Sequence, residues 1–278
     1  MRAEQVTEAV TYHGEGPVWS PTWGGLRFVD MLAGDVLTLL PDGGVRRMRV
    51  GEVAAFVRPR SAGGYVVGVE RGIGLADDVD APPTRVVELL AGQDARMNEG
   101  GCDPAGNLWA GSMRYDRRDG GGRLFRVDPA LGVEVAIDAV TIANGIAFTP
   151  DGTRAYFDDT TARRTDVFDV VEGRLTRRRT FHETTDGFPD GLTLDAAGNV
   201  WVAMFGGGRV RRLAPDGGVT DVLLPVRQVT ACAFGGEDLR DLYVTTSRED
   251  LDDPEPEAGA LFRIRTEVPG LPVLPYAG

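Results

Sequence analysis

The sequence predicts an all-β fold, a six-bladed β-propeller with four antiparallel strands in each blade. Three observations favour it: one strand–turn–strand unit recurs six times, turn residues are spread along the whole chain, and no segment has a sustained helical period. The 38 glycines and 17 prolines indicate many tight turns, because they do not gather in one tail. Six blades of four strands occupy nearly the full length, so we expect one domain spanning residues 1–278.

The repeated unit is a short apolar strand, a turn built from Pro, Asp or Gly, and a second apolar strand. Its six copies lie at residues 16–31, 54–70, 100–113, 145–160, 191–205 and 231–247. The turn glycines of the first five copies lie about 39 to 46 residues apart, close to the length of a four-stranded blade. A solenoid of similar units is the competing architecture, but its end repeats would need polar caps, which we do not find.

A second hairpin of alternating apolar and polar residues follows within each unit. Examples are residues 35–50, 122–137 and 208–224, and the first and third contain Pro-Asp-Gly-Gly turns, which are typical of hairpins. We expect the ring to close where an N-terminal strand around Gln5–Val10 pairs beside the last hairpin, near Leu261–Arg265. This pairing would leave no open sheet edge.

Composition excludes several classes of function. The formal charge of −12 disfavours a nucleic-acid partner, and all 30 basic residues are arginine, which excludes Schiff-base chemistry and lysine bases. No apolar run is long enough for a membrane helix and the N-terminal residues lack a signal core, so we expect a cytoplasmic protein, a monomer or weak oligomer. Cys102 and Cys232 are expected as buried free thiols on opposite sides of the axis.

The positions just before the first strand of each unit carry the candidate functional side chains. In chain order these positions carry Glu15, Val53 with Ala54, Asn98 with Glu99, Asn144, Asp190, and Thr230. Innermost strands of a propeller run beside its axis, so these side chains should point at one another around a ring. Carboxylates that converge in this way must be neutralised by a proton or a cation.

Glu15, Asn144 and Asp190 are the predicted metal ligands of this ring. They offer hard oxygen atoms without sulfur or paired histidines, a set that suits Ca, Mg or Mn and can also hold Zn or Fe(II). The alternative is that all three are ordinary turn residues, because Asn, Asp and Gly are favoured in turns. Their recurrence at one point of three repeats favours one divalent ion in the channel.

Four motifs resemble the senescence-marker protein/gluconolactonase/luciferin-regenerating enzyme-like family, also called regucalcin-like. They are GEGPVW (14–19), RMNEGGCDPAGNLWAGSM (96–113), NGIAFTPDGTRAYF (144–157) and PDGLTLDAAGNVWVAMFGGGRV (189–210). The resemblance covers essentially the whole chain and implies a six-bladed propeller. It also implies that Glu15, Asn144 and Asp190 bind the metal, that Asp190 acts as general base, and that Arg96 and Asn98 contact the substrate.

The function implied is hydrolysis of a small-molecule substrate, a sugar (aldono-) lactone. The ion would polarise the carbonyl, water would be activated by Asp190 or by the ion, and Arg96 with Asn98 would hold ring hydroxyls. One alternative is an organophosphate or other ester hydrolase on the same site, since a metal polarises a phosphoryl oxygen equally well. Another is a propeller without catalytic activity that binds metal or a protein partner.

One departure from the family pattern concerns the substrate. Family members that hydrolyse aldonolactones often carry a further acidic residue beyond the G-[ST]-M segment, but here an arginine-rich segment, RYDRRDGGG, follows Met113. Asp116 and Asp119 are the candidates to replace that residue, and the choice between them stays open.

Several polar residues receive no leading role. His13 is a candidate for the channel mouth, His182 is expected in a loop that reaches toward the same mouth, and the lack of G-x-S-x-G argues against a serine triad. The orientation of Glu99, toward the axis or away from it, stays open, because neighbouring strand residues point to opposite faces. The acidic segment 248–260 is expected to be an exposed loop of the last blade, and the arginine clusters 163–164 and 177–179 a solvated outer face.

Overall fold

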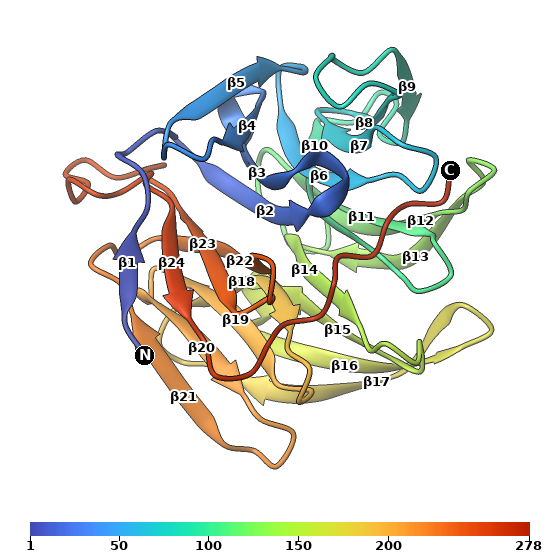
Figure 1. Ribbon diagram of the computed structural model, residues 1–278. Helices are drawn as coiled ribbons and strands as arrows, with labels where there is room; N and C mark the ends of the chain where they lie inside the picture. Colours follow the sequence, from blue (N-terminus) through green and yellow to red (C-terminus); the bar gives the residue numbers. More distant parts are fainter.

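The computed structural model describes residues 1–278 as six four-stranded antiparallel sheets arranged around a central axis (Figure 1). Blade one contains β2 (Gly14–Ser20), β3 (Gly25–Asp30), β4 (Asp35–Leu39) and β5 (Val45–Arg49). Blade two contains β6 (Ala54–Pro59), β7 (Tyr65–Val69), β8 (Gly72–Ala76) and β9 (Arg85–Glu88). Blade three contains β10 (Ala95–Cys102), β11 (Leu108–Arg114), β12 (Gly122–Val127) and β13 (Val133–Val140). Blade four contains β14 (Ala143–Phe148), β15 (Arg154–Asp159), β16 (Arg164–Val171) and β17 (Arg174–Glu183). Blade five contains β18 (Phe188–Leu194), β19 (Val200–Phe205), β20 (Arg209–Leu213) and β21 (Val219–Leu223). Blade six contains β22 (Val229–Gly235), β23 (Asp241–Thr246), β24 (Phe262–Arg265) and β1 (Ala3–Gln5). The predicted six-bladed propeller is confirmed.

Burial increases from the outer strand of each blade to the inner one. The outer strand β5, with sequence VRRMR, has only half-buried and exposed positions, whereas all residues of β10 are buried. The inner strands neighbour one another in the order β2, β6, β10, β14, β18, β22 and back to β2. They therefore line a central channel, and the apolar core lies between adjacent blades.

Two blades carry the same hydrogen-bonded turn after their inner strand. In blade three the Asp103 carboxylate accepts from the Asn107 backbone N–H (2.9 Å), the Asn107 side chain (2.8 Å) and the Trp109 indole (2.9 Å). Asp195, Asn199 and Trp201 repeat the arrangement in blade five. Because every polar group of the turn is satisfied, the buried tryptophans hold the inner hairpins in a fixed register.

Each inner strand is interrupted by a β-bulge near the same end of the channel. The pairing with the second strand shifts between Glu15 and Val18, Ala54 and Val57, Met97 and Gly100, Ala143 and Ile146, Pro189 and Leu192, and Val229 and Ala231. A bulge inserts an extra residue and redirects the side chains around it. Six bulges at one level therefore place a ring of redirected side chains around the axis.

The N-terminal strand completes the ring. β1 pairs with β24 in the register Ala3 with Ile264 and Gln5 with Phe262, so the sixth blade takes its outermost strand from the start of the chain (Figure 1). The predicted closure is confirmed, but the strand was expected at Gln5–Val10 and lies earlier. Beyond Gln5 the backbone follows the loop before β24, where Val6 N donates to Leu261 O at 2.8 Å.

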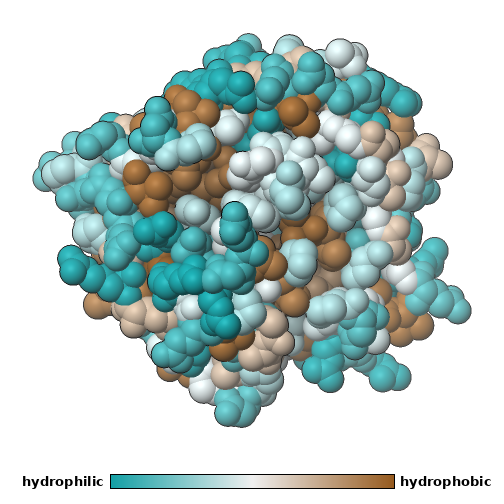
Figure 2. All heavy atoms as spheres, viewed as in Figure 1, coloured by the Kyte–Doolittle hydropathy of each residue, from teal (hydrophilic) through white to brown (hydrophobic).

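The last residues of the chain cross one face of the ring over the end of the channel opposite the ring of bulges. This C-terminal strap, residues 266–278, bonds to blade five through Ala196 N–Pro269 O (2.8 Å) and to blade two through Tyr276 N–Pro59 O (2.8 Å). On this face hydrophobic residues show near the centre and hydrophilic residues dominate the periphery (Figure 2).

Helical structure is confined to three short 3-10 turns, η1 (Pro21–Trp23), η2 (Met31–Ala33) and η3 (Thr160–Ala162). None of them has the length or apolar character of a membrane-crossing helix.

Candidate active site

A cavity of about 230 Å³ opens at the end of the channel where the bulges lie. Its lining residues come from five blades and are His13, Glu15, Arg96, Asn98, Met113, Arg117, Ile142, Asn144, Thr160, Asp190, Phe205, Gln228, Glu249 and Asp250. All five residues predicted to bind metal or substrate are among them. Most of the lining is polar, so the cavity suits a small hydrophilic molecule.

Asn144 and Asp190 lie in the bulges of neighbouring inner strands, and Glu15 lies at the edge of the bulge in the first blade. The Asn144 amide N–H donates to Thr160 Oγ1 at 2.8 Å. The amide oxygen of Asn144 therefore points away from the Thr160 hydroxyl. Glu15 Oε2 accepts from the Gly16 backbone N–H at 2.9 Å. Asn144 Oδ1 and Asp190 Oδ1 are buried and have no hydrogen-bond partner.

The surroundings of Glu15 and Asp190 disfavour the charged forms of their carboxyl groups. Burial, followed by the charge of nearby Glu99, raises the pKa of Glu15 well above its usual range. Burial, followed by the charges of Glu15 and Glu99, raises the pKa of Asp190 in the same way. Two buried acids that repel each other require a proton or a cation for their neutralisation.

These residues fit a hard divalent cation. Buried amide and carboxylate oxygens without hydrogen-bond partners are unfavourable unless a ligand satisfies them, and such oxygens are the donors that these cations prefer. No three His, Cys, Asp or Glu side chains of the chain form a metal-binding cluster. A metal site here therefore depends on the Asn144 amide together with Glu15 and Asp190.

Glycines after two of these residues allow the inner strands to approach each other. A Cβ on Gly145 would lie 2.5 Å from Leu192 N, and one on Gly191 would lie 2.5 Å from Ala231 Cβ. The contacts show that what the glycines leave room for is the backbone and side chains of the next blade.

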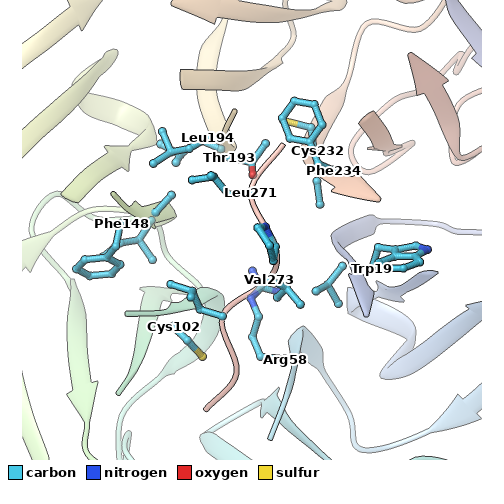
Figure 3. A pocket seen from close by; sticks show the side chains of 18 of the residues that line it. Trp19, Arg58, Cys102, Phe148, Thr193, Leu194, Cys232, Phe234, Leu271 and Val273 are labelled. Atoms are coloured by element: carbon cyan, nitrogen blue, oxygen red, sulfur yellow. The ribbon is translucent and has the colours of Figure 1, made fainter. Parts of the chain in front are cut away.

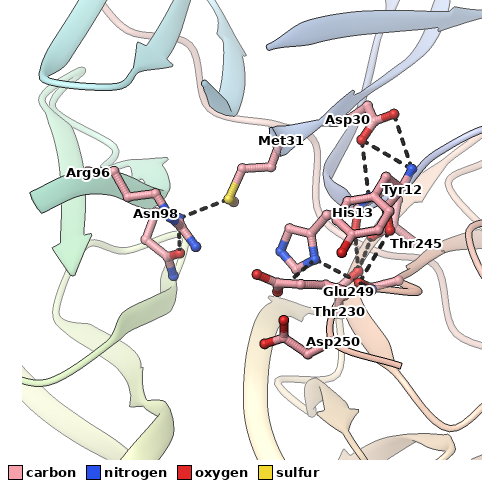
Figure 4. Close-up of polar contacts among 12 residues, drawn as sticks. Tyr12, His13, Asp30, Met31, Arg96, Asn98, Thr230, Thr245, Glu249 and Asp250 are labelled. Atoms are coloured by element: carbon pink, nitrogen blue, oxygen red, sulfur yellow. Dashed lines mark hydrogen bonds and ion pairs between the residues drawn. The ribbon is translucent and has the colours of Figure 1, made fainter. Parts of the chain in front are cut away.

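Arg96 and Asn98 form one wall of the cavity. The Arg96 guanidinium is buried and donates to Asn98 Oδ1 at 2.7 Å and to Met97 O at 3.1 Å (Figure 4). Asn98 Nδ2 donates in turn to Ala143 O at 3.0 Å, on the neighbouring blade. Arg96 is therefore a buried part of the cavity wall and does not belong to a surface ion pair.

His13 and Glu249 form the opposite wall, as Figure 4 shows. His13 Nδ1 lies 2.8 Å from Ser247 Oγ and 3.4 Å from Glu249 Oε2. Burial, then the positive charges of Arg96 and Arg117, lowers the pKa of His13 to about 3, so its imidazole is neutral. The mouth position expected for His13 is confirmed.

Glu99 also faces the channel, one step deeper than Asn98. Its carboxylate accepts from Gly100 N (2.8 Å) and from Arg58 (3.2 Å), and it lines a small cavity of about 20 Å³ that shares no lining residue with the main one. Burial raises the pKa of Glu99, while Arg58 opposes the shift. The strict alternation used for the sequence fails here because the bulge between Met97 and Gly100 interrupts it.

Three expectations about loops are wrong. Asp116 and Asp119 are exposed and do not line the cavity, and Asp116 pairs with Arg114 at 2.9 Å. His182 belongs to strand β17 and lines a different cavity with Arg211. The segment 248–260 is not simply an exposed loop, because Glu249 and Asp250 reach the candidate site.

A second cavity of about 230 Å³ lies at the opposite end of the channel, under the C-terminal strap (Figure 3). Its lining is mostly apolar, with Arg58 as its only charged residue, so it lacks groups for acid–base or metal chemistry. Cys102 and Cys232 border it as buried free thiols, as expected, and burial raises the pKa of Cys102 to about 12.

Comparison with known proteins agrees with this architecture. A model of the SMP-30/Gluconolactonase/LRE-like region matches residues 13–248. The chain is 40% identical to the 6-deoxy-6-sulfogluconolactonase of Pseudomonas putida, over 95% of both chains, and 37% identical to Pentonolactonase XacC of Haloferax volcanii, over 98% of this chain and 97% of the relative. The crystal structure of a calcium-binding protein, regucalcin, from Agrobacterium tumefaciens superposes with a TM-score of 0.92 at 30% identity, covering 98% of this chain and 96% of the other. The chain therefore belongs to the SMP-30/gluconolactonase/LRE-like family.

Proposed function

We propose that this protein is a lactonase that opens the ring of a small sugar lactone. The observation that carries the proposal is the cavity itself, where oxygens of Glu15, Asn144 and Asp190 face a space bordered by Arg96 and Asn98. Two relatives that align along nearly the whole chain are named as lactonases of sugar derivatives, which supports the same reaction class here.

We propose further that Glu15, Asn144 and Asp190 hold one divalent cation, with Ca, Mg, Mn, Zn and Fe(II) as candidates. When bound, the ion would supply a Lewis acid for the lactone carbonyl and would neutralise the buried carboxylates. The unpartnered oxygens of Asn144 and Asp190 support this assignment, as does the raised pKa of both acids.

Arg96, Asn98 and Asp190 have separate roles in the proposed hydrolysis. Arg96 and Asn98 hold ring hydroxyls and so fix the lactone carbonyl toward the carboxylates. Asp190 accepts a proton from water as the water oxygen bonds to the carbonyl carbon. The ring C–O bond then breaks, the proton returns to the leaving ring oxygen, and an open-chain hydroxy acid results. Burial raises the pKa of Asp190 in the chain without metal, and the ion, when bound, would keep this carboxyl group ionised and able to accept the proton.

Substitution of the two acids tests the proposal. We expect Asp190→Asn and Glu15→Gln each to lose about 100- to 1000-fold in kcat/KM for an aldonolactone, the loss typical of a removed electrostatic stabiliser. Both variants should also lose metal affinity. The readout is a pH-stat assay after chelation and re-addition of each candidate ion, with calorimetry for metal binding.

The exposed Glu52→Gln is the matched control and should keep full activity. Activity of either acid variant near that of the wild type would contradict the proposed roles. Turnover of phosphotriesters but not lactones would favour the organophosphate alternative. Metal binding with no turnover of either class would favour a propeller without catalytic activity.

A further inference from the structure

The wall of the cavity opposite Arg96 contains a carboxylate that neither the sequence patterns nor the proposed mechanism uses. Glu249 follows β23 in the loop of the last blade, and its side chain is only 15% exposed. It lines the cavity together with His13 and Asp250, across from Arg96 and Asn98 (Figure 4). Burial lowers the pKa of Arg96, and the negative charge of Glu249 is the leading charge effect that opposes this shift.

The position of Glu249 is fixed by several contacts. Its backbone N–H donates to Ser247 Oγ at 2.9 Å, and Ser247 N donates to Gln228 O at 3.0 Å. Glu249 Oε2 lies 3.4 Å from His13 Nδ1, and Oε1 lies 3.5 Å from the Arg117 guanidinium. Such a carboxylate is oriented before a substrate arrives, which reduces the entropy lost on binding.

The partner Arg117 explains why this acid comes from the last blade. Arg117 lies in the loop between β11 and β12, where Asp116 turns outward to Arg114 and Asp119 is exposed. That loop therefore presents a cation to the cavity, and Arg117 bonds to Asp250 at 3.0 Å besides its pair with Glu249. The two loops meet over the cavity, and the carboxylate on this wall is that of Glu249, from the loop of the last blade.

We propose that Glu249 is a specificity-determining residue, the carboxylate that accepts hydrogen bonds from the ring hydroxyls of the lactone. A vicinal hydroxyl pair donates and accepts at once, so it fits between the donor wall of Arg96 and an acceptor wall at Glu249. The substrate class is then polyhydroxylated lactones in preference to lactones without ring hydroxyls. The inference rests on the proposed lactonase function for its chemistry.

The charges around Glu249 support its role as an acceptor. Burial raises the pKa of its carboxyl group, but the positive charges of Arg96 and Arg117 oppose that shift. Hydrogen bonds to an ionised acceptor are stronger than neutral ones, and a buried site increases the difference.

Kinetics of Glu249→Gln on two lactones test the inference. Because a hydrogen bond to a charged group is lost, we expect KM for glucono-δ-lactone to rise about tenfold or more, with a smaller change in kcat. For δ-valerolactone, which has no ring hydroxyls, kcat/KM should stay within about twofold of wild type. The control Asp119→Asn, on the exposed loop, should match the wild type on both.

A binding experiment separates this inference from the proposed function. Calorimetry with 1,5-anhydroglucitol, a cyclic polyol with no carbonyl, should show binding to the wild type and a loss of about tenfold or more in affinity for Glu249→Gln. If the wild type hydrolyses no lactone but this difference is found, the proposed function fails, while the role of Glu249 as an acceptor for ring hydroxyls stands.

Three results would overturn the inference. The first is an unchanged KM for glucono-δ-lactone in Glu249→Gln, the second an equal loss on both lactones, and the third an absence of anhydroglucitol binding by the wild type. A thermal melt of Glu249→Gln that coincides with that of the wild type excludes misfolding as the cause of any loss.

Discussion

At the scale of single residues, the candidate site is a place where ionisation and folding are coupled. The carboxyl groups of Glu15 and Asp190 are buried near each other's charge, and each has a pKa raised well above its usual range. In an unfolded chain both groups would release their protons at the ordinary pH for carboxylic acids. The folded protein without metal therefore retains these protons at pH values where the unfolded chain has lost them.

This coupling predicts how metal stabilises the protein at different pH. Because the folded pKa is raised, the stability that these groups contribute is fully present in acid and is lost as the pH rises through the raised pKa. A cation binds the deprotonated pair, so the increase in Tm on adding metal to chelated protein should be larger at about pH 8 than at about pH 5. Thermal melts with and without the ion at both pH values measure it, and an equal increase at both would contradict the prediction.

At the scale of elements, the bulge of each inner strand decides which side chains reach the axis. The repeats of the sequence predict the ring of Glu15, Asn144 and Asp190, because equivalent positions of a repeat occupy equivalent places in space. They do not predict the orientation of Glu99, because a bulge shifts the alternation of a strand and no residue type marks it uniquely. Blade two contributes no residue to the cavity: its bulge contains buried Phe56, whose ring would lie 2.8 Å from a Cβ on Gly100.

Close packing of the bulges predicts the effect of a single methyl group. Gly145→Ala would place a Cβ within 2.8 Å of Asp190 O and 2.5 Å of Leu192 N, so blades four and five must move apart beside the candidate ligands. We expect a loss of about 1 to 3 kcal/mol in the free energy of unfolding, with weaker metal binding.

Chemical denaturation and calorimetry measure the two effects. Gly218→Ala, in an exposed turn of an outer hairpin, is the matched control and should change neither quantity appreciably. Metal affinity of Gly145→Ala equal to that of the control would show that the spacing of the two blades does not determine the site.

At the scale of the whole molecule, long-range contacts complete what the repeats begin. The fold follows from patterns inside each blade, whereas the contact of Arg117 with Glu249 joins loops of the third and sixth blades. Nothing in the spacing of residues 248–260 marks such a contact, because loops lack the periodicity that places strands. This is the physical reason why Asp116 and Asp119 were considered and Glu249 was not.

The C-terminal strap predicts a second long-range effect, on stability. Tyr276 is fully buried and its hydroxyl donates to Asp128 O at 2.7 Å, in the hairpin between β12 and β13. We expect Tyr276→Ala to lower the free energy of unfolding by about 3 to 5 kcal/mol, as for other large buried aromatic residues. Tyr276→Phe should cost only about 1 kcal/mol, since it removes one hydrogen bond.

Denaturant titrations of the two variants separate packing from hydrogen bonding. Equal losses in both would mean that the hydroxyl, and not the ring, anchors the strap. Lactone turnover should persist in Tyr276→Phe, because the strap covers the end of the channel opposite the candidate site.

The pairing of β1 with β24 also has a consequence for biosynthesis. Residues 3–5 leave the ribosome well before their partners, residues 262–265. Until that second segment emerges, the first blade has no sixth blade beside it and β1 has no partner. Closure of the ring is therefore a late step, which waits for residues 262–265.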